Sequence, residues 1–374
     1  MKVALTIPGG VDRSGRDRVV PMLLWLIERL ARRHELHVFV LDYYDEPCSY
    51  KLSGAEIHDL GRVRAVRGTR RFRMAARLAD AIRRHGGFDL LHAYWGMPAV
   101  VAAAALGSRS KMPLVVTLDS GELVRLDDIG YGLQRRWIDR RALRQAVDLA
   151  AAVTVPTRYM ANLVPAAIAP RVIPVGVDRR RFAAMPQPDG PPWRLIRVAS
   201  INPVKDYPTL LHAFAALLEQ EPDTTLDLVG EDLLGGTIQR LAGRLGLRRR
   251  VDFHGALPNE AVAQLYRRAH LNVVSSRHES ANVTVLEAAC CGVPTVGTNV
   301  GYVADFHPNR AAAVPARNPQ ALADAILVLL RDRERRRQLA AAAQAWGLRH
   351  DADWTAEAFD RLYHEVTQAE RRAR

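Results

Sequence analysis

Apolar strands alternate with amphipathic helices along most of the 374 residues, and this alternation limits the possible folds more than any other feature of the chain. Strand-like apolar runs lie at 3–8, 37–41, 90–94, 114–118 and 152–156, and again at 195–201, 225–230, 251–255, 271–276 and 294–297. Helical periodicity fills most intervals, first over 19–33. Strands separated by helices predict an α/β architecture with parallel sheets.

A Pro/Gly-rich stretch, P-Q-P-D-G-P-P over 186–192, interrupts the alternation, which restarts after it. Such stretches are typical of domain linkers, and the length suits two domains of ordinary size. Further along, Asn318-Pro319 predicts a helix start, with Asn at the N-cap and Pro at the first helical position. The sequence therefore predicts two α/β domains.

Two glutamates flank a predicted helix N-terminus in the segment 277–301. Glu279 comes just after an apolar strand, and Glu287 lies in the following helix. Between them, unpaired backbone N–H groups near Asn282 suit a diphosphate, while the two carboxylates suit sugar and ribose hydroxyls. This arrangement predicts a nucleotide-sugar site at the carboxyl end of a parallel sheet. The alternative is a surface helix preceded by a loop glutamate, because carboxylate pairs at this spacing are common.

The same segment, with its trailing L-E-A-x-x-C-G-x-P over 286–294, resembles the Glu-x7-Glu signature of retaining, nucleotide-sugar-dependent glycosyltransferases of group 1, family four. The resemblance implies the GT-B fold: two facing Rossmann-like domains with parallel sheets and a cleft between them. The first would span 1–180 and hold the acceptor, and the second would span 181–351 and hold the donor. The last helix, 352–374, would cross back to the first domain.

The stretches 173–182 (I-P-V-G-V-D-x-x-x-F) and 198–214 also resemble this family, and Lys205 matches its diphosphate-binding lysine. Ser200 replaces an arginine that often stands five positions earlier, so Asn202, Arg16 or Arg18 would have to substitute for it. Of four lysines in the chain, Lys205 alone lies in the C-terminal half. Its compact ammonium differs physically from the abundant guanidinium groups. The residues expected to bind the donor are Gly10, Ser200, Asn202, Lys205, Gly230, Leu257, Glu279, Ser280, Ala281, Asn282, Val283 and Glu287.

Asp119, Lys205 and Glu279 are the predicted catalytic residues. Asp119 begins an Asp-Ser-Gly-Glu run where many relatives have a histidine-glycine pair. Its carboxylate could bind sugar hydroxyls or stabilise positive charge at the anomeric carbon. It could instead form a turn, or mark a site that is no longer catalytic. His92 resembles a strand-end histidine of the family, with a core residue holding one hydrogen bond as the alternative.

The implied reaction moves a sugar from a UDP- or GDP-sugar to a hydroxyl acceptor, either a lipid-linked molecule or a growing polysaccharide. No cofactor or metal is expected, because Lys205, Asn202 and the helix N-terminus near Asn282 would stabilise the leaving diphosphate without an Asp-x-Asp cluster. Two alternatives keep the fold. One is a catalytically silent nucleotide-sugar-binding protein, favoured by Asp119 and Ser200, and the other is a sugar-nucleotide 2-epimerase.

The net charge of +13 is concentrated in the first half, with +11 over residues 1–180 and +2 over the rest. Arginines cluster at 62–73 and at 135–144, where Trp137, Ile138 and Leu143 interleave with them. Such patches attract anionic lipid surfaces, although they could equally be solvated arginine-rich faces. We expect no nucleic-acid partner, because no such motif is present.

Cys48, Cys290 and Cys291 form no C-x-x-C pair, which is typical of a reducing compartment. The apolar run at 3–8 is too short for a signal peptide, and no run approaches bilayer-spanning length. We therefore expect a cytoplasmic protein that is either soluble or bound peripherally to the cytoplasmic membrane, with a lipid-linked acceptor favoured.

Overall fold

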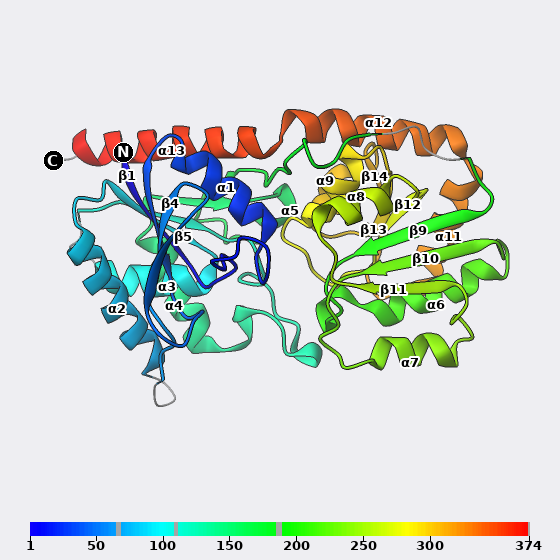
Figure 1. The fold of residues 1–374 in the computed structure, drawn as a ribbon, viewed down its shortest axis with the longest axis horizontal. Coiled ribbons are helices and arrows are strands. Elements are labelled where there is room, and N and C mark those ends of the chain that lie inside the picture. The colour runs from blue at the N-terminus through cyan, green and yellow to red at the C-terminus, as the bar shows by residue number, and fades with distance from the viewer. Residues whose placement is uncertain (65–68, 108–110, 185–188, 373–374) are drawn as a thin grey trace. The chain divides into compact units, whose positions relative to one another are not determined.

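A computed structural model describes residues 1–64, 69–107, 111–184 and 189–372, which divide into two compact units (Figure 1). Unit 1 comprises Met1–Val175 and Ala352–Arg374, and unit 2 comprises Gly176–Asp351. The first boundary therefore precedes the predicted position at 180. Residues 186–188 of the proposed linker and 65–68 of the first arginine cluster lie outside the described residues.

The sheet of unit 1 has the strand order β3-β4-β2-β1-β5-β6-β7-β8 and is parallel except for the β3–β4 pair. Its strands are β1 (Lys2–Ile7), β2 (Glu35–Val40), β3 (Cys48–Leu52), β4 (Ala55–Asp59), β5 (Leu90–Tyr94), β6 (Leu114–Thr117), β7 (Ala152–Val155) and β8 (Arg171–Val172). The longer helices are α1 (Pro21–Ala31), α2 (Arg70–His85), α3 (Gly96–Leu106), α4 (Trp137–Asp148) and α13 (Ala352–Arg372), and α5 (Arg158–Ala161) is a single turn.

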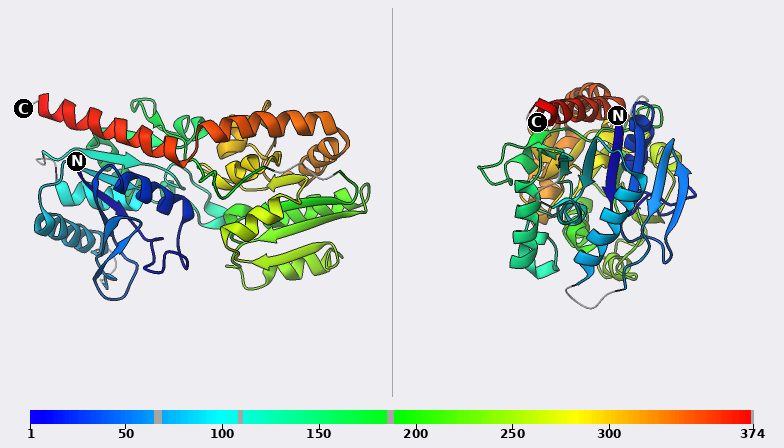
Figure 2. Two further views of the ribbon diagram at one scale, coloured as in Figure 1. Left: turned by 45° about the horizontal axis from the view of Figure 1, so that its top comes forward. Right: turned by 90° about the vertical axis from the view of Figure 1, so that its left-hand side faces the viewer.

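Alternating side chains of these strands enter two separate cores, because successive residues of a strand point to opposite faces of the sheet. Val3, Leu5 and Ile7 of β1 pack with α1 and with Phe359 of α13, whereas Ala4 belongs to the core formed with α2, α3 and α4. The C-terminal helix lies beside α1 in Figures 1 and 2. The helix predicted over 352–374 therefore packs on the first unit.

The hairpin of β3 and β4 was not predicted from the sequence. Exposure alternates along β3, and the turn between the strands places Ser53 and Gly54 at φ 52° and 84°. Polar residues such as Lys51 and Glu56 therefore interrupt the apolar pattern. An edge hairpin with one solvated face gives a weaker apolar signal than a strand buried on both faces.

Unit 2 has a six-stranded sheet, ordered β11-β10-β9-β12-β13-β14, in which all pairs are parallel. Its strands are β9 (Trp193–Val198), β10 (Thr224–Val229), β11 (Val251–Gly255), β12 (Leu271–Val274), β13 (Thr295–Thr298) and β14 (Ala311–Val314). The connecting helices are α6 (Tyr207–Leu218), α7 (Thr237–Arg244), α8 (Asn259–Tyr266), α9 (Val283–Cys290), α10 (Gly301–Phe306), α11 (Pro319–Arg331) and α12 (Arg333–Arg349).

This strand order reverses direction between β9 and β12, as in a Rossmann fold, where ligands bind outside the carboxyl ends of the strands. The strand β14 and the helix α12 were not predicted. The predicted cap of α11 is confirmed, because the Asn318 side chain accepts a hydrogen bond from the Ala321 amide at 3.0 Å.

Candidate functional site

Three charged side chains meet at the reversal point of the unit 2 sheet. The Lys205 ammonium lies 2.8 and 2.7 Å from the two carboxylate oxygens of Glu279. Arg197 places Nη2 3.4 Å from Oε1 of the same carboxylate, and the Ser276 hydroxyl donates to this oxygen at 2.6 Å. The structure thus brings together the predicted residues Lys205 and Glu279 and adds Arg197.

The local sequence holds Lys205 in place through a short turn. Asn202 caps the 3₁₀ turn Pro203–Lys205, and its side-chain oxygen accepts from the Val204 and Lys205 amides. Its amide nitrogen donates to the Ser200 hydroxyl at 3.0 Å. Asn202 and Ser200 therefore organise the loop that carries the lysine.

The cluster of Arg197, Lys205 and Glu279 contains two cations and one anion. Burial opposes ionisation of Glu279, but the charges of Lys205 and Arg197 outweigh it and lower the pKa of the carboxyl. Arg197 is fully buried, and its Nε and Nη1 atoms have no hydrogen-bond partner among the described residues. One positive charge thus remains in excess. The Lys205 side chain is 20% exposed, so a ligand can reach it.

Glu287 lies in the second turn of α9, as predicted, and is buried. Burial raises its pKa to about 7. Within the described residues, no hydrogen bond or ion pair is formed by this carboxyl group, which leaves its oxygens available to a ligand. Asn282 precedes α9 in a left-handed conformation (φ 66°) without capping it, and its buried side-chain N–H₂ has no partner among the residues that the structure describes.

The remaining predicted donor residues of unit 2 lie in the loops that follow its strands. Gly230 has φ +145°, and a Cβ there would lie 2.0 Å from the Ala199 carbonyl oxygen, so only glycine fits beside the loop that contains Ser200. The Gly230 amide donates to the carbonyl of Gly255, two residues before the half-buried Leu257. Ser280 and Ala281 lead from Glu279 to Asn282, followed by Val283 as the first residue of α9.

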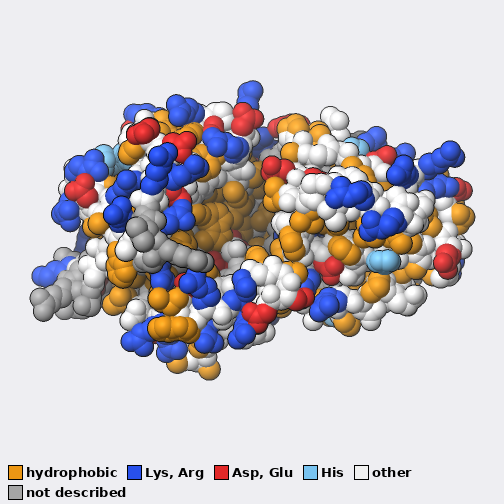
Figure 3. Space-filling model, turned by 90° about the horizontal axis from the view of Figure 1, so that it is seen from below, with side chains coloured by type: hydrophobic (Ala, Val, Ile, Leu, Met, Phe, Trp, Pro, Cys, Tyr) orange, Lys and Arg blue, Asp and Glu red, His pale blue; other side chains and the backbone are white. Residues whose placement is uncertain are grey.

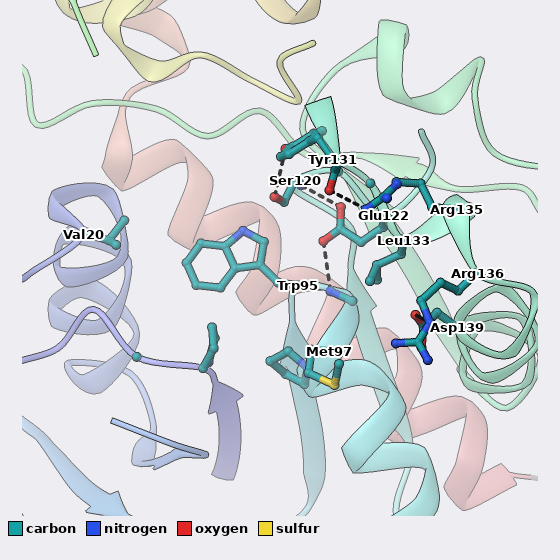
Figure 4. A pocket seen from close by; sticks show the side chains of 17 residues that line it. Val20, Trp95, Met97, Ser120, Glu122, Tyr131, Leu133, Arg135, Arg136 and Asp139 are labelled. Carbon is teal, nitrogen blue, oxygen red and sulfur yellow. Dashed lines mark hydrogen bonds and ion pairs between the residues drawn. The ribbon is translucent and has the colours of Figure 1, made fainter. Parts of the chain in front are cut away.

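Unit 1 contains a pocket of about 710 Å³ at the reversal point of its own sheet, outside the carboxyl ends of β1, β5 and β6. Figure 4 shows Trp95 and Glu122 near its centre, with Val20 on one side and Arg135 and Arg136 on the other. The lining is mainly apolar, with Arg135 and Arg136 at one end, where the Asp139 carboxylate lies 3.8 Å from Arg136. It suits a ligand with an apolar or ring-shaped body and an anionic group.

Glu122 organises this pocket, which the sequence did not reveal. Its carboxylate accepts from the Gly96 amide, at the start of α3, and from the Ser120 amide, at 2.9 and 2.7 Å. Burial raises its pKa to about 7, with a smaller contribution from nearby Asp119. Glu122 therefore positions the start of α3 against the loop after β6.

Asp119 is buried beside this pocket but does not line it. Its carboxylate accepts a hydrogen bond from the Tyr94 hydroxyl at 3.0 Å, and its backbone carbonyl accepts from the Trp95 indole at 2.9 Å. Gly10 follows β1 with φ +84°, where a Cβ would meet Val20 at 2.7 Å. Both residues belong to unit 1, whereas the charged cluster belongs to unit 2.

His92 is a core residue that makes two hydrogen bonds rather than the one expected. It is fully buried on β5, with Nδ1 2.6 Å from the Tyr363 hydroxyl and Nε2 2.7 Å from Thr117. Burial lowers its pKa to about 3. Arg18, one candidate to replace the missing arginine, pairs with Asp12 at 2.7 Å. Arg197, which the sequence analysis did not select, is the arginine that accompanies Lys205.

Two Rossmann-like units, the second with a Lys–Glu–Arg cluster at the reversal point of its sheet, define the GT-B class of glycosyltransferases. The family profile of glycosyl transferases group 1 matches residues 178–346, and that of glycosyltransferase family 4 matches residues 22–181. The chain belongs to this family of glycosyltransferases.

Curated relatives extend over most of the chain. A D-inositol 3-phosphate glycosyltransferase of Corynebacterium jeikeium is 29% identical over 75% of this chain and 73% of its own length. A GDP-mannose-dependent α-(1-6)-phosphatidylinositol monomannoside mannosyltransferase of Mycolicibacterium smegmatis is 26% identical over 86% of this chain and 88% of its own.

Solved structures share the fold. A sucrose-phosphate synthase from Thermosynechococcus elongatus has a TM-score of 0.82 at 21% identity, covering 98% of this chain and 99% of its own. Anabaena HepE, solved with UDP and glucose, has a TM-score of 0.75 at 19% identity, covering 98% of this chain and 100% of its own. These similarities confirm the predicted GT-B fold.

Proposed function

We propose that this protein is a retaining, metal-independent glycosyltransferase that moves a sugar from a UDP- or GDP-sugar to a hydroxyl group of a phosphate-bearing, lipid-linked acceptor. The observation that supports this most is the excess positive charge of Lys205 and Arg197 around Glu279. The Lys205 ammonium would turn from Glu279 toward the donor diphosphate, leaving the Glu279 carboxylate to accept from a sugar hydroxyl. Arg197 would keep that carboxylate ionised and in place.

Departure of the nucleotide diphosphate needs stabilisation where negative charge develops. In this proposal Lys205 and the backbone N–H groups at the start of α9 supply it, so no divalent ion is needed. Retention would follow from attack on the face from which the diphosphate departs, with a phosphate oxygen taking the proton of the acceptor hydroxyl. Asp119 remains a proposed catalytic residue, as a carboxylate that would stabilise positive charge on the sugar.

The acceptor assignment rests on the pocket of unit 1. Arg135 and Arg136 suit a phosphate, because guanidinium groups match its geometry, and the apolar lining suits a sugar or cyclitol ring. Both curated relatives are named for acceptors that contain a phosphate group. Their names do not identify the acceptor of this chain, but they agree with an anionic one.

Donor turnover without an acceptor tests the chemistry. The protein, treated with EDTA, is incubated with UDP- and GDP-sugars of several kinds, and free sugar, free nucleotide and altered nucleotide sugars are measured. We expect slow release of free sugar that keeps its anomeric configuration, and faster transfer when a phosphatidylinositol-type acceptor is added. Activity that EDTA abolishes and manganese restores would contradict the metal-free assignment. A silent protein releases no sugar, and a 2-epimerase converts the donor without any acceptor.

Replacing Glu287 by glutamine should weaken donor binding more than it slows turnover. An ionised carboxylate accepts stronger hydrogen bonds from ribose hydroxyls than a neutral group does. Because the pKa of Glu287 is raised to about 7, the donor KM of the wild type should fall as pH rises through about 7. That dependence should disappear in Glu287→Gln, whose KM should be higher above this pH with a nearly unchanged kcat. An unchanged KM and an unchanged pH profile would contradict the ribose assignment.

Unit 1 should bind anionic vesicles through exposed aromatic residues among arginines. Phe72 of α2 and Trp137 of α4 are 71% and 68% exposed, and an ion pair between Arg71 and Asp139 at 3.3 Å links the two helices. Figure 3 shows many Lys and Arg side chains on the left-hand part of the molecule, which is unit 1. No helix of the described residues is both long and apolar enough to cross a bilayer, so any attachment by these helices would be at the surface.

Flotation with phosphatidylglycerol-containing and purely phosphatidylcholine vesicles tests this surface at low and high salt. We expect binding only to the anionic vesicles, weakened by salt because charges are screened over about 8 Å at physiological ionic strength. The double variant Phe72→Ser, Trp137→Ser should lose most of the binding to anionic vesicles. Val328→Ser in unit 2, a residue 60% exposed, is the matched control and should bind normally. Equal recovery with neutral vesicles would contradict the membrane assignment.

A further inference from the structure

Three histidines of unit 1 converge at the edge of its sheet, and the proposed reaction uses none of them. His37 lies on β2, His58 lies on β4, and His85 is the last residue of α2. One ring nitrogen from each lies within 4.8 Å of the other two. His37 and His58 are buried, and His85 is exposed. Three imidazoles with one open side have the composition of a metal site.

The hydrogen bonds around His37 determine which of its nitrogens is free. Its Nε2 atom lies 3.2 Å from the Glu35 carboxylate. An ionised carboxylate can only accept, so Nε2 carries the proton and a neutral ring keeps a lone pair on Nδ1. That lone pair faces Nε2 of His58 at 2.9 Å.

The hydrogen bond between His58 and Ser49 determines whether the His58 nitrogen that faces His37 also bears a lone pair. Its Nδ1 atom lies 3.0 Å from the Ser49 hydroxyl. When Ser49 accepts this hydrogen bond, Nε2 of His58 also bears a lone pair, and two lone pairs face each other. Two nitrogen lone pairs that face each other repel unless a cation lies between them. When Ser49 donates instead, the two rings share an ordinary hydrogen bond and need no cation.

A shared proton is a poor cation for this position. Burial, with the charges of His85 and His37, lowers the pKa of His58 to about 4, and burial lowers the pKa of His85 as well. Neutral imidazole is the form that binds metal ions. A metal ion can therefore occupy the position between the facing nitrogens of His37 and His58, where a proton is disfavoured.

The distances suit zinc. Zn–N bonds of about 2.0–2.1 Å at a tetrahedral angle place two ligand nitrogens about 3.3 Å apart, close to the 2.9 Å between His37 and His58. The ring nitrogens of His85 form no hydrogen bond within the described residues, so this exposed ring can turn inward. A solvent molecule can take the fourth position. Glu35, behind His37, is the kind of carboxylate that commonly orients a metal-bound histidine.

We propose that His37, His58 and His85 bind one divalent transition-metal ion, with zinc as the best match. Imidazole suits zinc, nickel and copper better than magnesium or calcium. Nearby carboxylates partly balance the nearby cations, because Lys2 pairs with Glu35 at 3.1 Å and Glu56 acts against the charge of Arg84 at His58. The ion would join β2, β4 and the end of α2, and so stabilise unit 1 apart from the charged cluster of unit 2.

The test uses the untagged full-length chain after dialysis against a chelator, at about pH 7.5, where neutral imidazole prevails. Zn²⁺ is titrated by calorimetry and Co²⁺ by visible absorption. We expect one ion per chain, the intense absorption of tetrahedral cobalt and a higher Tm with Zn²⁺. His85→Asn should abolish all three without unfolding, because His85 is exposed. Glu35→Gln should weaken binding by about 10-fold or more.

His364→Asn is the matched control, since His364 is an exposed histidine on α13 of the same unit. It should bind Zn²⁺ as the wild type does. Absence of stoichiometric binding, or binding that survives in His85→Asn, would overturn the proposal and leave a cluster held by hydrogen bonds alone. Either result is distinguishable from failure of the glycosyltransferase assignment, because that assignment is tested by sugar release from the donor and this one by metal titration.

Discussion

Replacing Lys205 by alanine should lower kcat/KM by on the order of 10²-fold or more, as expected for loss of one preorganised group that stabilises a leaving oxyanion. The Lys205 ammonium is partly exposed and bonds to both oxygens of Glu279, 2.8 and 2.7 Å away. In the proposed reaction it turns to the diphosphate, where negative charge grows as the glycosidic bond breaks. The effect should therefore fall mainly on kcat.

Lys205→Arg should restore only part of the activity, because a planar guanidinium cannot occupy the space of a compact ammonium between phosphate oxygens. Initial rates over a range of donor concentrations measure both variants. Lys51→Ala is the control, since Lys51 is 82% exposed in unit 1. Full activity of Lys205→Arg would show that charge alone suffices, and full activity of Lys205→Ala would remove Lys205 from the catalytic residues.

Replacing Arg197 by methionine should lower kcat/KM by about 10²-fold while the protein stays folded. Arg197 contacts the same Glu279 oxygen as Lys205 does and helps to hold it, and a displacement of about 1 Å at a reacting centre can cost this much activity. Two nitrogens of the buried guanidinium have no hydrogen-bond partner in the part of the chain that the structure describes, so its loss should change stability little. Lys205 still pairs with Glu279 in this variant, so the substitution leaves no uncompensated buried charge.

Thermal unfolding and steady-state kinetics measured together test Arg197→Met. Arg336→Met supplies the matched control, because Arg336 is a buried arginine of unit 2 that bonds to the Leu329 and Leu330 carbonyls and stacks on Trp193. It should lose stability without a specific loss of activity. If Arg197→Met lost stability and kept its kcat/KM, Arg197 would be a structural residue only.

Much of the fold could be predicted because its signals are local. Strands buried on both faces appear as short apolar runs, as β5 does, and both β5 and the more exposed edge strand β11 have the predicted bounds. Glu279, Asn282 and Glu287 lie within one strand-to-helix connection, so their spacing alone placed them near one helix N-terminus. Lys205 was found through its segment, which resembles a family motif. The hairpin of β3 and β4 was not predicted, because polar residues on its solvated face interrupt the apolar pattern.

By itself, the sequence determined the two α/β units, the connection that carries both glutamates and the lysine before α6, since each depends on neighbouring residues in the chain. Only the tertiary structure decided which side chains from separate elements contact one another. Arg197 appears as a polar interruption of an apolar strand until the strand order places β9 beside β12 and turns its guanidinium toward Glu279. His37, His58 and His85 likewise lie on three separate elements. Contacts between residues far apart in sequence depend on strand order and packing, which local patterns do not encode.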